Sequence, residues 1–173
     1  MDTDSVRVGR RGGGRLAISS LLLAGLVVGC SPLSGDAVGA AATTRTAEAS
    51  RPTLMVYKSP SCMCCHRWVE HMQNAGFRVE VHDTTDLAGI KAKAGIESSL
   101  ASCHTAFVGR YAIEGHVPAA DVERLLREHP DVAGLTAPGM PNGAPGMESL
   151  MRDKYDVLAF QRDGATSRFA THP

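Results

Sequence analysis

Residues 54–65 read LMVYKSPSCMCC, and this stretch decides the fold. It opens with the apolar run 54–57, and the turn signal Ser59-Pro60-Ser61 follows, which predicts a short buried strand. From Cys62 onward, apolar residues recur at three- and four-residue spacing as far as Ala75, which is typical of a helix. The sequence therefore predicts a strand that turns directly into a helix, with three cysteines at the junction.

The rest of the chain extends this pattern into a mixed sheet. The expected strands are 77–81, 105–108 and 111–114, and the expected helices are 87–94, capped by Asp86, and 118–128. The order β-α-β-α-β-β-α, with a right-handed first crossover, predicts an α/β fold of the thioredoxin-like type, a mixed four-stranded sheet flanked by helices. We expect an irregular loop over 130–148, and a second hairpin, 155–161 and 166–170, that extends or covers a sheet edge.

The N-terminal segment is typical of an exported protein. Four arginines lie within residues 1–15, and the uncharged run 16–28 that follows is too short to span a bilayer. The sequence Val27-Val28-Gly29-Cys30 resembles a lipobox, in which Cys30 is lipidated; ordinary cleavage near residues 38–40 is the alternative. We therefore predict an export signal over 1–29, a flexible tether over 30–51 and one folded domain over 52–173.

Charge and motif content exclude several functional classes. The chain has 18 basic and 18 acidic residues, and this balance argues against binding to nucleic acid. We find no glycine-rich phosphate loop, no paired-carboxylate site and no Ser/His/Asp arrangement. Hydrolysis and nucleotide chemistry therefore have no support in the sequence.

The cysteines carry the clearest chemical signal. Cys62, Cys64 and Cys65 contain both a C-x-x-C, suited to dithiol chemistry, and a C-x-C, suited to chelation. Helical spacing predicts that Cys62 and Cys65 share a face while Cys64 projects elsewhere. Cys103 lies just before the expected strand 105–108, at the position where a thioredoxin-like loop normally ends in a cis-proline. Four converging sulfurs would favour Cu(I), with Zn(II) next.

Further donors are candidates for the same site. His104 adjoins Cys103 and could bind Cu(II) or tune the sulfur, while Met140 and Met147 carry thioethers that suit Cu(I). Both methionines lie in the long loop, where packing into apolar gaps is the alternative. We interpret His116 as a loop residue that satisfies backbone groups.

Three other interpretations of the cysteines stay open. One is a pair of ordinary disulfides in an oxidising compartment. Another is a thiol–disulfide oxidoreductase for protein substrates, in which Cys62 and Cys65 are the redox pair and copper is incidental. The third is a structural Zn(II) site, whose chelation would unfold the domain.

Several motifs in order resemble the CopG-type copper-resistance proteins of Gram-negative bacteria (not the repressor of the same name). They are the SPxCxCC run at 59–65, SCHT at 102–105, IEGHVP at 113–118, GMP at 139–141 and PGME at 145–148. The resemblance covers nearly the whole expected domain. It implies a thioredoxin-like fold, copper bound by the cysteine cluster, and thiol chemistry coupled to the Cu(I)/Cu(II) state.

Together these features predict a periplasmic, lipid-anchored protein of copper resistance. Cys62, Cys64, Cys65 and Cys103 would hold Cu(I), and a disulfide between Cys62 and Cys65, or between the cluster and Cys103, would form when metal is absent. Disulfide formation releases two electrons, so the chain could also reduce Cu(II), as a copper oxidoreductase would. Expected partners are copper ions and other copper-resistance or periplasmic redox proteins, with membrane contact only through the N-terminal lipid.

Overall fold

The computed structural model describes residues 52–173. The predicted export signal, Cys30 and the tether lie outside the described residues and stay predictions. Within the described part, no helix is both long enough and apolar enough to cross a bilayer.

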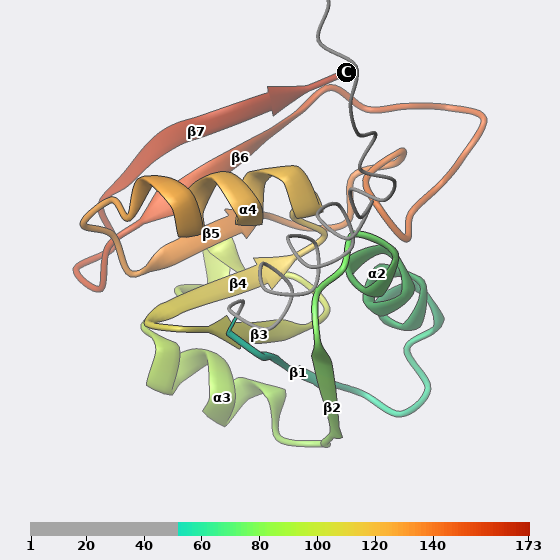
Figure 1. Cartoon of the computed structure of the whole chain (residues 1–173), viewed down its shortest axis with the longest axis horizontal. Coiled ribbons are helices and arrows are strands. Elements are labelled where there is room, and N and C mark those ends of the chain that lie inside the picture. The colour runs from blue at the N-terminus through green and yellow to red at the C-terminus, as the bar shows by residue number, and fades with distance from the viewer. Residues whose placement is uncertain (1–51) are drawn as a thin grey trace, which may run out of the picture. The chain divides into compact units, whose positions relative to one another are not determined.

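The described residues form one seven-stranded mixed sheet in the order β2-β1-β3-β4-β5-β6-β7 (Figure 1). β1 pairs with β2 in parallel and with β3 antiparallel, and β3 and β4 form the predicted hairpin. β5 then runs parallel to β4, and β6 and β7 continue the sheet as a second antiparallel hairpin. The strands are β1 Leu54–Lys58, β2 Val79–Asp83, β3 Thr105–Val108, β4 Tyr111–Gly115, β5 Gly134–Ala137, β6 Tyr155–Phe160 and β7 Thr166–His172.

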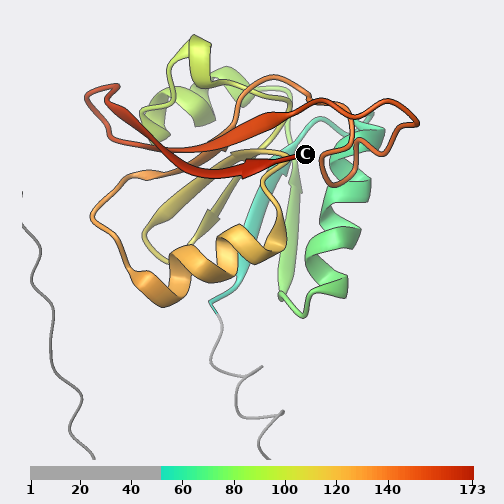
Figure 2. The ribbon, with the colours of Figure 1, turned by 90° about the horizontal axis from the view of Figure 1, so that it is seen from above.

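Helices cover both faces of the sheet (Figure 2). α2 (Met63–Asn74) and α4 (Ala119–Glu128) share the larger core cluster, where Trp68 and Leu125 are fully buried. α3 (Leu87–Ala94) and a short 3-10 turn, Ser98–Leu100, belong to the smaller cluster. Apolar residues at three- and four-residue spacing give α2 and α4 one buried face each, which packs against the sheet.

The α/β class is confirmed, but the predicted count of four strands is wrong. The second hairpin extends the sheet, as one of the two expectations had it, and β5 connects that hairpin to β4. β5 lies in the segment predicted to be irregular. Its first residue, Gly134, lies so close to Ala112 that a Cβ would overlap the β4 backbone. The absence of a side chain at Gly134 therefore lets β5 pair closely with β4.

We expect the free energy of unfolding to fall as the pH is lowered below about 6.5, partly through His71. Burial lowers the pKa of His71, although Glu148 opposes the shift, and its Nε2 accepts a hydrogen bond from Ala119 N at 3.1 Å. Because the folded-state pKa is depressed, this stabilisation is present above the unfolded pKa and is lost as the pH falls through the folded pKa.

Urea unfolding of wild type and His71→Gln at about pH 7.5 and about pH 5.5 checks this expectation. The glutamine side chain keeps an acceptor for the Ala119 amide and does not titrate, so the variant should lose less stability between the two pH values. An equal loss in both proteins would contradict it.

Candidate metal centre

Three segments meet at one end of the sheet. β1 ends at Lys58 and leads into the turn before Cys62, β3 begins two residues after Cys103, and β4 ends just before His116. Because β1 and β3 are antiparallel, with Tyr57 opposite Thr105, the end of one strand lies beside the start of the other. The sheet topology therefore brings together residues that are far apart in the sequence.

Cys62 precedes the helix that carries Cys64 and Cys65. It is the N-cap of α2, and its Sγ accepts a hydrogen bond from Cys65 N at 3.3 Å. Cys62 and Cys65 form a disulfide, with Cα atoms 5.3 Å apart. Cys64 and Cys103 are free, and Cys65 alone of the four is fully buried.

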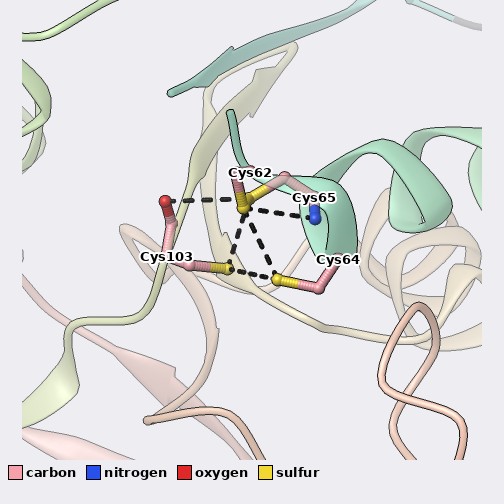
Figure 3. Close-up of side chains that lie close together, drawn as sticks. All are labelled: Cys62, Cys64, Cys65 and Cys103. Carbon is pink, nitrogen blue, oxygen red and sulfur yellow. Dashed lines mark hydrogen bonds between the residues drawn. A yellow bond between two sulfur atoms is a disulfide. The ribbon is translucent and has the colours of Figure 1, made fainter. Parts of the chain in front are cut away.

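The four sulfurs form one compact group (Figure 3). Cys103 Sγ lies 3.4 Å from Cys65 Sγ and 3.9 Å from Cys64 Sγ. Cys64 Sγ is in turn 3.5 Å from Cys62 Sγ. All four sulfur atoms lie within 4.8 Å of one another. The prediction that Cys64 projects away from its neighbours is wrong, because its side chain turns toward Cys103 at the head of the helix.

Two histidines enlarge this group on the side of Cys103. His116 Nε2 lies 3.0 Å and His104 Nδ1 lies 3.3 Å from Cys103 Sγ, so Cys103 and the two histidines form a second set of potential metal ligands. His116 Nδ1 is 2.8 Å from the carbonyl oxygen of Pro145, to which it must donate. In the neutral ring, the lone pair of Nε2 then faces the Cys103 sulfur.

Burial favours the neutral form of each of these groups. Burial, and then the neighbouring Cys64, raises the pKa of Cys103 to about 12. Burial, followed by the charge of His116, holds the pKa of His104 well below its usual value, and burial also lowers the pKa of His116. Neutral imidazoles are the form that binds metals, and a soft metal ion would displace the thiol proton.

The loop between β5 and β6 packs on the first turn of α2, but its methionines Met140 and Met147 differ in exposure. Gly146 packs on the helix, where a Cβ would lie 2.6 Å from Cys64 O and 2.8 Å from Trp68 N. Met147 follows it and is half-buried, whereas Met140 is 55 % exposed. The Met140 backbone follows Gly139, whose carbonyl accepts a hydrogen bond from Ser102 Oγ. The structure therefore places Met147 half-buried next to Gly146 and Met140 largely exposed next to Gly139.

Comparison with known structures establishes the family. A solved structure of copper resistance protein CopG, form 2, is 39 % identical, with a TM-score of 0.67; the match covers 70 % of this chain and 98 % of that one. Form 1 is 40 % identical, with the same coverage and the same TM-score. The chain belongs to the CopG family. A family model described as protein of unknown function DUF411 also matches residues 100–147 of this CopG homologue, whereas no curated protein matches it.

The donor set suits the metal in the name of these CopG proteins. Thiolate and imidazole ligands favour Cu(I), with Zn(II) the main competitor, and carboxylates are absent from the two ligand groups in the described residues. The fully buried His104 presents Nδ1 to Cys103 Sγ at 3.3 Å. The residues present therefore fit a soft metal ion.

Sequence reasoning missed His116 as a member of the site. It expected a loop residue that satisfies backbone groups, and the contact with Pro145 O agrees with that expectation. The other ring nitrogen, however, faces Cys103. The sequence did contain one signal for this role. In the predicted β3–β4 hairpin, Thr105 pairs with Glu114, so His116 follows β4 on the side where Cys103 precedes β3.

Proposed function

We propose that this chain is an exported copper-binding protein that holds Cu(I) in the group formed by Cys62, Cys64, Cys65 and Cys103, in the service of copper resistance. The observation that carries the proposal is the convergence of four sulfurs within 4.8 Å from two segments distant in sequence. The copper-resistance names of both related structures support the choice of metal. His104 and His116 would supply additional nitrogen ligands, and Met140 and Met147 would supply thioethers from the loop.

Thiol chemistry in this group would be coupled to the oxidation state of copper. As Cys62 and Cys65 form their disulfide, they give up two electrons and two protons, and two Cu(II) ions each accept one electron to become Cu(I). Cys64 and Cys103 then remain as thiols beside the two imidazoles. The disulfide form would therefore still hold Cu(I), with two fewer sulfur ligands than the reduced form.

The remaining parts of the proposal concern fold type and location. The order β2-β1-β3-β4, with α2 after β1, supports a thioredoxin-like core to which β5–β7 are added. The basic start, the short apolar run and the lipobox-like Cys30 support export to the periplasm with an N-terminal lipid anchor. Copper-resistance or redox proteins of that compartment would be its partners.

Anaerobic titration with Cu(I) against a chromophoric chelator tests the copper site. We expect tight binding by the fully reduced protein, fewer ions bound by the disulfide form, and no competitive binding once all four cysteines are serines. Adding Cu(II) to reduced protein should yield about two Cu(I) ions for each disulfide formed. The proposal would be contradicted if the reduced protein bound Cu(I) only weakly and if this weak binding persisted after Cys62 and Cys103 were both replaced by serine.

The disulfide favours a second candidate, a thiol–disulfide oxidoreductase. Cys62, half-buried at the helix start, and Cys65, buried behind it, are placed as the two members of a dithiol pair. This function requires only that pair, so Cys64→Ser and Cys103→Ser should be mild. Turnover of insulin disulfides without metal would favour the oxidoreductase, and no turnover combined with tight Cu(I) binding would favour the copper site.

A further inference from the structure

The loop that carries Cys103 is anchored on a buried carboxylate. Glu114 on β4 has no exposed surface, and its oxygens accept hydrogen bonds from Ser102 N at 2.6 Å and from Thr105 Oγ1 at 2.6 Å. Lys91 on α3 also donates to this carboxylate and has only 14 % of its side chain exposed. One side chain thus connects α3 and β3 to the backbone next to Cys103.

Stability alone gives a weak reason for a charge in this position. Burying an ion pair costs desolvation energy that its attraction often fails to recover, and apolar replacements of similar volume are commonly as stable. What an apolar side chain could not do is accept the Ser102 N–H. The contact of Glu114 with the residue that precedes Cys103 is therefore the feature that needs an explanation.

The other hydrogen bonds of this loop leave the backbone N–H of Ser102 to Glu114. The backbone of Gly139 donates a hydrogen bond to Ala101 O at 3.1 Å and accepts one from Ser102 Oγ. The Gly115 N–H donates to His104 O at 3.0 Å, on the other side of Cys103. A Cβ on Gly115 would overlap the Ser102 side chain. The backbone N–H of Ser102 donates to the Glu114 carboxylate at 2.6 Å, so this carboxylate fixes the backbone of the residue that precedes Cys103.

We propose that Glu114 is a positioning residue for the metal centre: by holding Ser102, it places Cys103 Sγ in contact with the sulfurs of Cys64 and Cys65. For its effect on copper the inference rests on the proposed function; the positioning itself does not. The length of the Glu114 side chain, more than its charge, then determines where the Cys103 sulfur lies.

Two variants separate length from charge. Glu114→Asp keeps the charge but shortens the side chain by one methylene, so the carboxylate no longer reaches Ser102 N with the present geometry. Lys91→Met with Glu114→Gln keeps the length and a carbonyl acceptor, and removes both charges so that neither is left buried alone. Glu128→Asp, in the exposed Arg124–Glu128 pair on α4, is the matched control for shortening a glutamate.

The first readout needs no metal. In a background of Cys62→Ser and Cys64→Ser, only Cys65 and Cys103 remain in the domain, and the rate at which diamide joins them reports the distance between their sulfurs. We expect Glu114→Asp to slow this reaction markedly, whereas the double variant and Glu128→Asp stay close to the parent. The second readout is Cu(I) affinity in the four-cysteine protein, which Glu114→Asp should lower by about 10- to 100-fold, as is usual for an outer-shell partner.

Each outcome decides the matter. Unchanged crosslinking in Glu114→Asp, or an equal loss in the double variant, overturns the positioning role. If wild type fails to bind Cu(I) while the crosslinking rates follow the expected order, the proposed function falls and the positioning role stands. Should Glu114→Asp not fold, amide exchange in wild type decides: slow exchange at Ser102 N–H supports the anchor, and exchange as fast as in exposed loops overturns it.

Discussion

Replacing Cys103 by serine should lower the affinity for Cu(I) by at least about 100-fold, more than the loss of a typical outer-shell contact. Cys103 Sγ is the atom that the two ligand groups share, since it contacts the sulfur of Cys65 and also His116 Nε2. A serine hydroxyl is a hard, neutral donor and would be a poor replacement for a thiolate ligand to a soft metal ion. Competition against a chromophoric Cu(I) chelator measures the change.

Two controls make this result specific. The melting temperature of metal-free Cys103→Ser should stay near that of wild type, because serine is close to cysteine in size and Cys103 is only half-buried. The Cys62–Cys65 disulfide should also form normally, since Cys103 is not part of it. Affinity within a few-fold of wild type would show that Cys103 is not a ligand, and would leave the oxidoreductase function in place.

Gly146→Ala should destabilise the domain by about 3 kcal/mol, with a fall in melting temperature of about 10 °C. Gly146 has a φ of +83°, which is unfavourable for any other residue, and a Cβ there would overlap the backbone at Cys64 and Trp68. To relieve the overlap, the loop must move away from the head of α2. Pro145, whose carbonyl orients His116, would move with it.

Gly139→Ala is the matched control for this substitution. Its φ of +71° imposes a similar conformational cost, about 1 kcal/mol, but no atom lies within 4 Å of the position that its Cβ would take. The difference between the two variants in thermal unfolding therefore isolates the contact of the loop with α2. Equal destabilisation would mean that the loop does not pack on the helix as described.

Local sequence signals predicted most of the elements. Asp86 caps α3 by accepting from Gly89 N, and Gly95 ends that helix in a left-handed conformation, as the residue types indicated. The boundary between β1 and α2 fell at Cys62 because proline and serine break the strand just before it. These features depend on residues within one or two turns of each other, and such interactions are legible in a pattern.

Non-local pairing was the part that patterns could not reveal. β5 has four residues and no alternation, and it is a strand because β4 and β6 supply its hydrogen-bond partners. The same holds for the burial of Glu114, which looks like a surface charge in the alternation of β4 and becomes interior only once α3 covers it. Neither property exists before the sheet is assembled.

The amino-acid sequence by itself determined the chemistry available to this protein: three thiols at a helix start, one more before a strand, and the family to which these motifs belong. The tertiary structure decided which groups meet. Cys103 lies 39 residues from Cys64, and the antiparallel pairing of β1 with β3 brings their sulfurs to 3.9 Å. The reason is physical, because residue type fixes what a side chain can bind, whereas chain topology fixes how far its atoms are from those of distant residues.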